Sequence, residues 1–458
     1  MQKVILVEFN ELCPALLSRW MKSGDLPNFK RLHDCSDVYI SSADEVEPDA
    51  LEPWIQWYSI HTGLPFSAHK VFHLTDGPSA GHPDIWSLLH DGGKSVWNCS
   101  SMNARQFSYP GSAYLPDPWC TSETPHPKEL EVFHRFVGHH VREYSNTNQK
   151  LGVKLALEFV LFMIRNGLKL STIFALLRQY ISEVLSSGKT RWQRVALQDR
   201  FLFDMFSAYF KRLQPTFSTF FANSTAHLQH SHWRHMDPAI FTIKLSAQEL
   251  TQYKDAILFG YQQMDRLLGD MVKLGGPEAR IIFATGLSQQ PYLKHEHLRG
   301  QNFYRPHSIE ELLSKLGIIA IVVQAVMTHQ FLAHFENQNE TDKARYILES
   351  LKLDGNVIFG FSGSEPNSLY FGSQIHTVVS SGSEIVSSAI PEFSWKFFDV
   401  FYRIEDLKSG RHHPDGCLWI QSGKHRQHAD KVSILDILPT VCKLLNVPIS
   451  GYAGRPLV

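Results

Sequence analysis

The chain has 458 residues, with 44 lysines and arginines against 45 aspartates and glutamates, and a formal net charge of −1. This even balance gives no general attraction to nucleic acid or to an anionic membrane, so we expect no nucleic-acid partner. The longest apolar runs, 155–164 and 316–327, are shorter than the ~18 residues that a membrane-spanning helix needs, so we expect no membrane span. The first residues enter a strand without a charged lead and an apolar signal core, and we therefore expect a cytoplasmic protein.

The first predicted strand is the apolar run 4–7, which is typical of a strand buried on both faces of a sheet. In open α/β sheets, ligands bind beyond the carboxyl ends of the strands. Asn10 follows this run directly and is therefore a candidate ligand-binding residue.

A helix is predicted to start near Glu52 and Pro53 and to end at Gly63. Proline suits the first turn of a helix, because its missing N–H would have no partner there. Glu52 is a candidate to present a carboxylate to a pocket. Alternatively, it interacts only with the helix dipole.

Residues 151–210 are helical in character, with apolar residues at helical spacing interrupted at Gly167 and at 186–188. We predict that residues 146–210 form a helical cap, inserted into an α/β core of residues 1–145 and 211–458. Alternatively, these helices form a layer over one face of the sheet. The cap is also a candidate contact surface for a protein partner.

Four histidines, His227, His230, His232 and His235, lie within nine positions after a predicted strand at 216–221. This density is close to that of metal ligands. If the segment is helical, His227 and His230 share one face. The alternative is a histidine-rich surface helix or loop with no ligand.

Several motifs in sequence order resemble the type I phosphodiesterase/nucleotide pyrophosphatase branch of the alkaline phosphatase superfamily. They are VILVEFNELCP at 4–14, the Thr-Gly pair that ends the helix at 62–63, TAHLQHSHWR at 225–234, GRHHPDG at 410–416, LDILPTV at 435–441 and GRPL at 454–457. The resemblance implies an α/β fold with a mainly parallel central sheet and helices on both faces.

The resemblance also implies a site for two metal ions and a threonine nucleophile at a helix start. His230 and His412 occupy two of the seven implied positions as retained metal ligands. Five positions are replaced, by Asn10, Pro53, Ala226, Ala284 and Thr285, and Pro53 stands where the nucleophile would be. This inherited set contains no carboxylate, so two adjacent cations would lie there almost unneutralised.

The first hypothesis is therefore a pseudoenzyme that needs no cofactor and binds a phosphorylated or other anionic ligand, or a protein partner. Its candidate ligand-binding residues are Asn10, His227, His230, Arg411 and His412.

The alternative hypothesis is an active phosphoester or sulfoester hydrolase with a rebuilt single-metal site. In it, zinc or manganese is held by His230, His412 and a further residue such as His227 or His413, because three protein ligands and an open position make a competent catalytic zinc site. The histidines at 295 and 297 form a separate loop cluster that we expect to be solvated.

Overall fold

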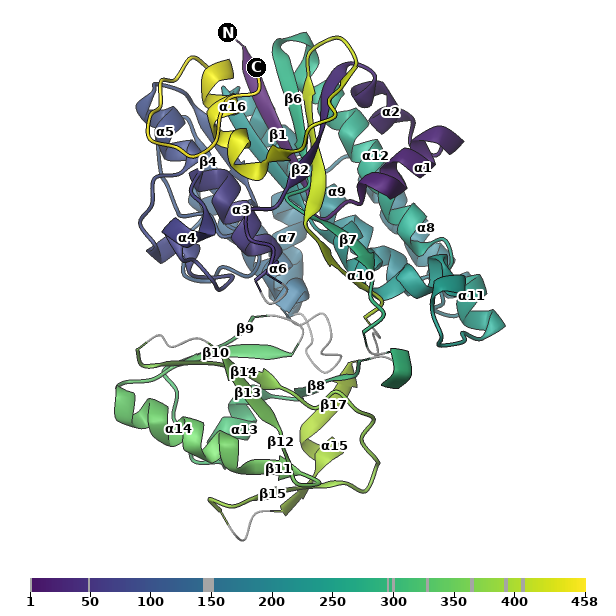
Figure 1. The fold of residues 1–458 in the computed structure, drawn as a ribbon, viewed down its shortest axis with the longest axis vertical. Coiled ribbons are helices and arrows are strands. Elements are labelled where there is room, and N and C mark those ends of the chain that lie inside the picture. Colours follow the sequence, from purple (N-terminus) through teal and green to yellow (C-terminus); the bar gives the residue numbers. More distant parts are fainter. Residues whose placement is uncertain are drawn as a thin grey trace. The chain divides into compact units, whose positions relative to one another are not determined.

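The computed structural model describes residues 2–47, 50–142, 152–294, 296–298, 301–326, 329–362, 366–390, 394–404 and 408–458. Contacts between residues divide the chain into two compact units, both drawn in Figure 1. The core unit comprises Met1–Gly138, Gly152–Tyr292 and Ser409–Val458. The second unit comprises His139–Leu151 and Leu293–Lys408.

A large sheet forms the centre of the core unit. Its strands are β1 (Lys3–Phe9), β2 (Ser36–Ser42), β3 (Val96–Cys99), β4 (Ala113–Leu115), β5 (Phe217–Ala222), β6 (Ala279–Ala284), β19 (Asp415–Gln421), β20 (Arg426–Gln427) and β21 (Val432–Ser433). Among the described residues it has 9 strands, in the order β20-β2-β19-β6-β1-β5-β3-β4 with β21 beside β2. β1 runs parallel to β5 and β6, whereas β19 runs antiparallel to β2 and β6. The predicted, mainly parallel α/β sheet is therefore confirmed.

Helices cover both faces of this sheet (Figure 1). The helices with residues in the core unit are α1 (Pro14–Ser23), α2 (Pro27–His33), α3 (Pro53–Thr62), α4 (Phe66–His69), α5 (Ile85–Asp91), α6 (Glu131–Arg142), α7 (Val153–Arg165), α8 (Leu170–Leu185), α9 (Val195–Leu213), α10 (Ser224–Met236), α11 (Ala247–Tyr253), α12 (Ala256–Gly275) and α16 (Ile437–Leu444). Successive side chains of a strand point to opposite faces. Phe9 of β1 packs on Phe29 of α2, while the neighbouring Glu8 contacts His61 of α3, so α2 and α3 lie on opposite faces.

The central strand β1 is buried on both faces, as its apolar run predicted. Val4, Ile5, Leu6 and Val7 are each at most 1% exposed. The helix predicted after Glu52 is also confirmed. α3 begins at Pro53 and ends before Gly63, whose left-handed φ of 64° terminates the helix in the usual way.

The second unit is an α/β unit with its own hydrophobic core. Its strands form a sheet in the order β13-β14-β10-β9, another in the order β12-β11-β15-β16, and the pair β8 and β17. These elements are β8 (Phe303–Pro306), α13 (Ile309–Lys315), β9 (Val322–Ala325), β10 (Gln330–His334), α14 (Gln338–Ser350), β11 (Leu351–Leu353), β12 (Asn356–Val357), β13 (Phe359–Ser362), β14 (Ser368–Ser373), β15 (Glu384–Ser387), β16 (Ser394–Lys396), α15 (Phe397–Val400) and β17 (Phe401–Ile404). The core joins buried residues from Tyr304 to Phe401, with Phe331 and Phe371 from its strands and Leu348 from α14 among them.

This division differs from the predicted one, which placed residues 293–408 in the core and made residues 146–210 a separate cap. Helices α7, α8 and α9 belong to the core unit, and residues 146–151 lie outside the described ranges. The physical reason is aromatic packing. Phe159 of α7 contacts Phe133 of α6 and Phe201 of α9, and Phe206 of α9 packs on Phe220 of β5. In the described part of the chain, none of the helices combines the length and apolar character needed to cross a membrane.

Candidate functional site

Glu11 lies directly beyond the carboxyl end of β1, at the edge of the sheet where ligands of α/β proteins bind. Its backbone has a left-handed φ of 64°, an uncommon conformation for a residue other than glycine. The N–H of Glu11 donates to Thr285 O beyond β6 (3.1 Å), and the N–H of Asn10 donates to Ala222 O of β5 (3.0 Å). The three neighbouring strand ends are therefore tied together, and the Glu11 side chain is buried.

Two histidines from distant parts of the sequence approach the Glu11 carboxylate. Nε2 of His230 lies 3.2 Å from Glu11 Oε2, and Nε2 of His412 lies 3.4 Å from the same oxygen. Ligand atoms of these three residues all lie within 4.8 Å of one another, a spacing that suits one metal ion. We call Glu11, His230 and His412 the histidine–glutamate cluster.

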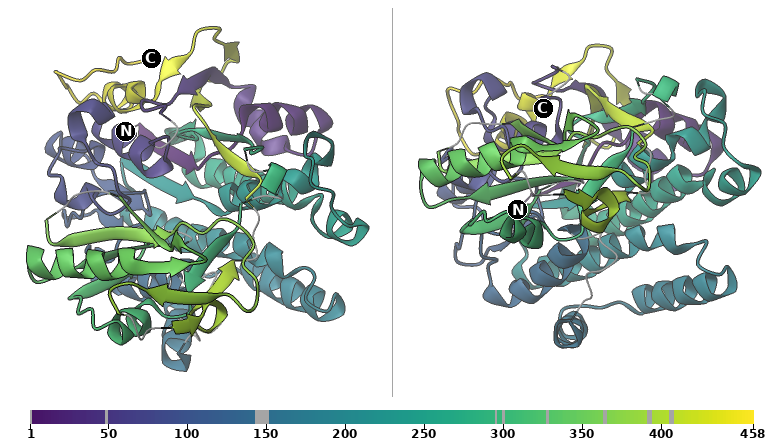
Figure 2. Two further views of the ribbon diagram at one scale, coloured as in Figure 1. Left: turned by 60° about the horizontal axis from the view of Figure 1, so that its bottom comes forward. Right: turned by 90° about the horizontal axis from the view of Figure 1, so that it is seen from below.

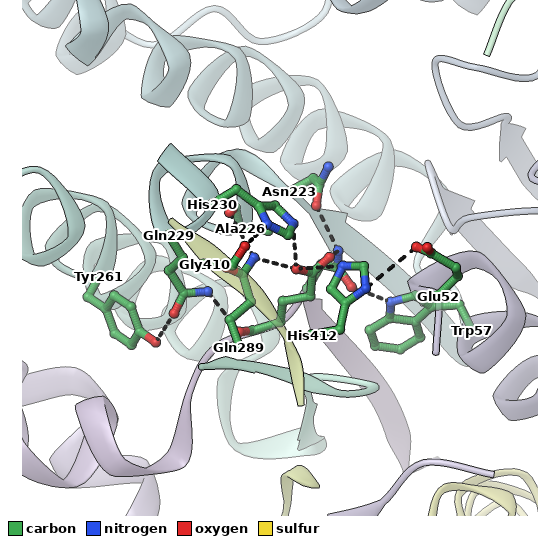
Figure 3. A network of polar contacts seen from close by, with 12 residues as sticks. Glu52, Trp57, Asn223, Ala226, Gln229, His230, Tyr261, Gln289, Gly410 and His412 are labelled. Carbon is green, nitrogen blue, oxygen red and sulfur yellow. Dashed lines mark hydrogen bonds and ion pairs between the residues drawn. The ribbon is translucent and has the colours of Figure 1, made fainter. Parts of the chain in front are cut away.

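The other ring nitrogen of each histidine is also engaged (Figure 3). His230 Nδ1 lies 2.9 Å from Gly410 O, and His412 Nδ1 lies 3.5 Å from Glu52 Oε2. A backbone carbonyl can only accept, so His230 Nδ1 carries a proton and donates it. Metal-binding histidines typically hold their second ring nitrogen in this way, on a carbonyl or a carboxylate, which fixes the tautomer and the ring orientation.

Amide side chains hold both the carboxylate and the backbone of Glu11 by hydrogen bonds. Asn10 Nδ2 donates to Glu11 Oε1 (2.7 Å), and Gln289 Nε2 donates to Oε2. Gln229 Nε2 donates to the backbone oxygen of Glu11 (2.8 Å), and the Tyr261 hydroxyl in turn donates to Gln229 Oε1 (2.7 Å). The carboxylate is therefore held in place before any ligand binds.

Two short antiparallel strands, β7 (Ser288–Pro291) and β18 (Gly410–His413), bring the side chains of Gln289 and His412 to the cluster. Gln289 and His412 are opposite each other in this pair, so their side chains share one face. Arg411 alternates with His412 and points the other way, where its exposed guanidinium lies 6.0 Å from the ring of Tyr292. The structure therefore does not bring Arg411, a predicted ligand-binding residue, into the cluster.

The electrostatics of the cluster favour a charged carboxylate. Burial alone would raise the pKa of Glu11, but the charges and hydrogen bonds of His412 and His230 outweigh burial and hold this pKa well below its ordinary value of about 4.5. Glu11 is therefore an anion over the neutral pH range, although it is buried.

The lowered pKa predicts a pH dependence for the metal-free protein. A carboxyl group whose pKa is lower in the folded state stabilises the fold above its unfolded pKa of about 4.5, and this stabilisation is lost as pH falls through the lowered folded value. We expect the difference in unfolding free energy between the wild type and Glu11→Gln to be full just above about pH 5, where the two histidines are charged, and to shrink steadily as pH falls further. Urea denaturation in the presence of chelator, across a series of acidic to neutral buffers, measures this difference. A difference that stays constant with pH would contradict the ion-pair arrangement.

None of the five replaced positions of the family resemblance carries a carboxylate or an imidazole, and polar atoms at three of them already accept hydrogen bonds. Asn10 Oδ1 already accepts from Trp57 Nε1 (2.7 Å). The buried hydroxyl of Thr285 accepts from the N–H of Cys417 (2.8 Å), and the backbone oxygen of Ala226 accepts from Gln289 (3.0 Å). Within the described ranges, the other group with metal-ligand spacing is a surface group of His33, Asp34 and His425.

Several predicted candidates lie near the cluster without joining it. His227 precedes His230 by one turn on α10, and it does not belong to the group with metal-ligand spacing in the described part of the chain. His413 Nδ1 accepts from the N–H of Asp415 (3.1 Å). His232 stacks on Tyr253, with ring centroids 4.8 Å apart. Of the loop cluster at 295–297, residue 295 lies outside the described residues.

Sequence reasoning missed Glu11, which supplies the carboxylate of the site. A signal was present, because Glu11 is the next residue after Asn10 and follows the same buried strand. The resemblance placed the ligand on Asn10, and the left-handed turn at Glu11 is what brings the next side chain into the site instead. The structure places Glu52, a predicted pocket residue, against His412.

The core unit is thus an open α/β protein with a candidate metal centre at the carboxyl edge of its sheet. No family model matches the sequence, and no curated protein matches it. Similar solved structures include murine ectonucleotide pyrophosphatase/phosphodiesterase 5 (11% identity, TM-score 0.41) and the alkaline phosphatase PafA (13%, 0.45), each covering 99% of this chain and 98% of its own. Phosphonoacetate hydrolase from Sinorhizobium meliloti is similar at 14% identity and a TM-score of 0.39, covering 97% of this chain and 95% of its own.

Proposed function

We propose that this protein is a metal-dependent hydrolase of phosphoesters or sulfoesters that holds one divalent cation, zinc or manganese, with Glu11, His230 and His412. One observation carries the proposal. Nε2 atoms of both histidines converge on one buried carboxylate oxygen, while His230 Nδ1 donates to Gly410 O and His412 Nδ1 lies 3.5 Å from a carboxylate oxygen of Glu52. Two imidazoles and one carboxylate form a common ligand set for catalytic zinc, and the same donors also suit manganese.

A divalent cation held by Glu11, His230 and His412 would supply Lewis-acid chemistry and activate water for hydrolysis. The chain's own residues position the ligands. Glu52 orients His412 through Nδ1, and Asn10 and Gln289 orient Glu11. Pro53 has no hydroxyl, so the chain supplies no nucleophile at the position that the resemblance assigns to one. We therefore propose direct hydrolysis by water, without a covalent enzyme intermediate.

The substrate class in this proposal comes from the sequence motifs. The segments 225–234 and 410–416 resemble the parts of alkaline phosphatase superfamily enzymes that bind the first of two metal ions, and they carry His230 and His412. Phosphoesters and sulfoesters are tetrahedral oxyanion esters, and a single cation beside two imidazoles suits either of them.

A second candidate function is a pseudoenzyme that binds an anion without turning it over. Two features favour it, namely Pro53 at the implied nucleophile position and Asn10 Oδ1, which already accepts from Trp57. In this hypothesis the cluster serves binding alone. The lack of a carboxylate among the inherited ligand positions does not favour this function, because Glu11 provides a carboxylate.

The proposal predicts one equivalent of zinc or manganese per chain. Chelator-treated protein should take up this equivalent in a calorimetric titration. Metal binding should also raise the free energy of unfolding by about 2.7 kcal/mol at a metal concentration 100 times the dissociation constant, and the melting temperature should rise with it. Metal-loaded protein should hydrolyse nitrophenyl esters of phosphate or sulfate, and His230→Ala should abolish both metal uptake and hydrolysis. His227→Ala, one turn away on the same helix, is the matched control and should retain both.

Three other outcomes would contradict the proposal, each in a different way. Two equivalents of metal would mean that donors outside the cluster complete a second site. No metal uptake would mean that Glu11, His230 and His412 form only ion pairs with one another and do not bind metal. One equivalent with anion binding but no hydrolysis of any ester would establish the pseudoenzyme.

A further inference from the structure

The outward face of α8 is apolar. Large apolar or aromatic side chains on this helix are each at least 52% exposed, and they are Leu170, Phe174, Leu177, Tyr180, Ile181, Val184 and Leu185. The spacing from Leu170 through Phe174, Leu177 and Ile181 to Val184 is four, three, four and three residues, which keeps these side chains in one stripe along the helix.

The inward face of α8 is largely polar. Thr172 is the buried residue of this helix, and Gln179 Nε2 donates to Glu183 Oε1 (2.8 Å) and to Thr190 O (2.8 Å). At the start of the helix, the N–H of Lys169 donates to Asp204 Oδ2 of α9 (3.0 Å). This polarity is the reverse of that of an ordinary surface helix, whose apolar stripe faces the core.

Helix α7, which precedes α8, is apolar on two sides. Its inward residues Phe159, Phe162 and Met163 are buried, and Phe159 stacks on Phe136 of α6 with ring centroids 3.6 Å apart. A second stripe is between 48% and 75% exposed and consists of Val153, Leu157, Val160, Leu161 and Ile164. Large exposed apolar side chains gathered on successive helices are typical of an interaction site. In both views of Figure 2, the blue-teal ribbon of α8 lies at the edge of the core unit.

The segment that carries both stripes is basic, although the whole chain has a net charge of −1. Residues 152–194 contain seven lysines and arginines and two glutamates, a net charge of 7 − 2 = +5, which leaves −6 on the remainder. Two of the basic side chains are in ion pairs, Lys169 with Asp204 and Arg194 with Glu183. The others have exposed side chains, and they are Lys154, Arg165, Arg178, Lys189 and Arg191.

We infer that the outer faces of α7 and α8 lie on an anionic membrane surface, with both helices in the plane of the lipid head groups. Apolar residues on one face with lysine and arginine alongside are the features of helices that bind such interfaces. The helices have 13 and 16 residues, too few to span a bilayer. A second copy of the chain would bring two segments of charge +5 together, and this repulsion favours anionic lipid over self-association. The inference does not rest on the proposed function.

The test is sedimentation of the full chain with lipid vesicles. We expect binding at least about tenfold stronger to vesicles with about 30% phosphatidylglycerol than to pure phosphatidylcholine, and weaker binding as salt screens the charges. Replacing Phe174, Leu177 and Ile181 by glutamate should abolish this binding. Replacing the same three residues by serine should weaken it without adding charge.

The matched control places three glutamates on other exposed apolar positions, Ile319, Ile321 and Tyr346, and should bind vesicles as the wild type does. Equal loss of binding in the control would show that added negative charge alone explains the effect. Absence of binding to anionic vesicles would overturn the inference. So would a wild-type dimer in analytical ultracentrifugation that the serine variant dissociates, because a second copy would then cover the stripes. Circular dichroism and thermal melting verify that each variant is folded.

Discussion

Glu11→Gln should cost the protein its bound metal ion and reduce ester hydrolysis by roughly 100-fold or more, because it removes the one anionic ligand of the cluster. Glutamine is nearly isosteric with glutamate and still accepts the hydrogen bond from Asn10. The variant therefore tests charge and metal binding rather than packing. Metal content after extensive dialysis and the hydrolysis rate with added zinc or manganese are the two measurements.

Two further variants separate the effect of charge from those of side-chain length and of the carboxylate beside His412. Glu11→Asp keeps the charge but shortens the side chain, so it should bind metal more weakly than the wild type and more tightly than Glu11→Gln. Glu52→Gln leaves the ligands in place and removes only the carboxylate beside His412 Nδ1, for which we expect a loss of about 10-fold to 100-fold in metal affinity. If Glu11→Gln kept a full equivalent of metal at wild-type affinity, the site would have to lie elsewhere.

Gly410→Ala should destabilise the core unit by about 1–3 kcal/mol and disturb the cluster, although it adds a single methyl group. A Cβ at this position would lie 2.4 Å from the backbone oxygen of Gln229 and 2.6 Å from Gln289 Oε1. Both glutamines hold Glu11, and the carbonyl of Gly410 itself accepts from His230 Nδ1. We therefore expect a lower urea midpoint and weaker metal binding from the same substitution.

Gly382→Ala is the matched control, because a Cβ there would meet no atom within 4 Å. It should leave the urea midpoint and the metal affinity close to those of the wild type. If Gly410→Ala behaved like Gly382→Ala, the close approach of β18 to Gln229 and Gln289 would not be a constraint on the site.

Local patterns in the sequence were sufficient to predict much of the core. The apolar run 4–7 predicted a strand covered on both faces, and Pro53 with Gly63 predicted the bounds of α3, because burial and backbone conformation depend on residues close together in the chain. The second unit was missed. Its strands are mostly three to six residues long, and the apolar residues that build its core are contributed from 304 to 401, so no single stretch shows the pattern.

The sequence by itself identified His230 and His412 as the retained histidines, because each lies in a recognisable motif. Only the tertiary structure decided that Glu11 joins them. Its side chain enters the site through a left-handed backbone turn that is held by a hydrogen bond to Thr285, more than 270 positions away in the chain. The reversed polarity of α8 was equally hidden, since an amphipathic pattern shows that a helix has an apolar face but not which way that face points. That direction depends on the packing of α8 against α9, where Asp204 holds the N–H of Lys169.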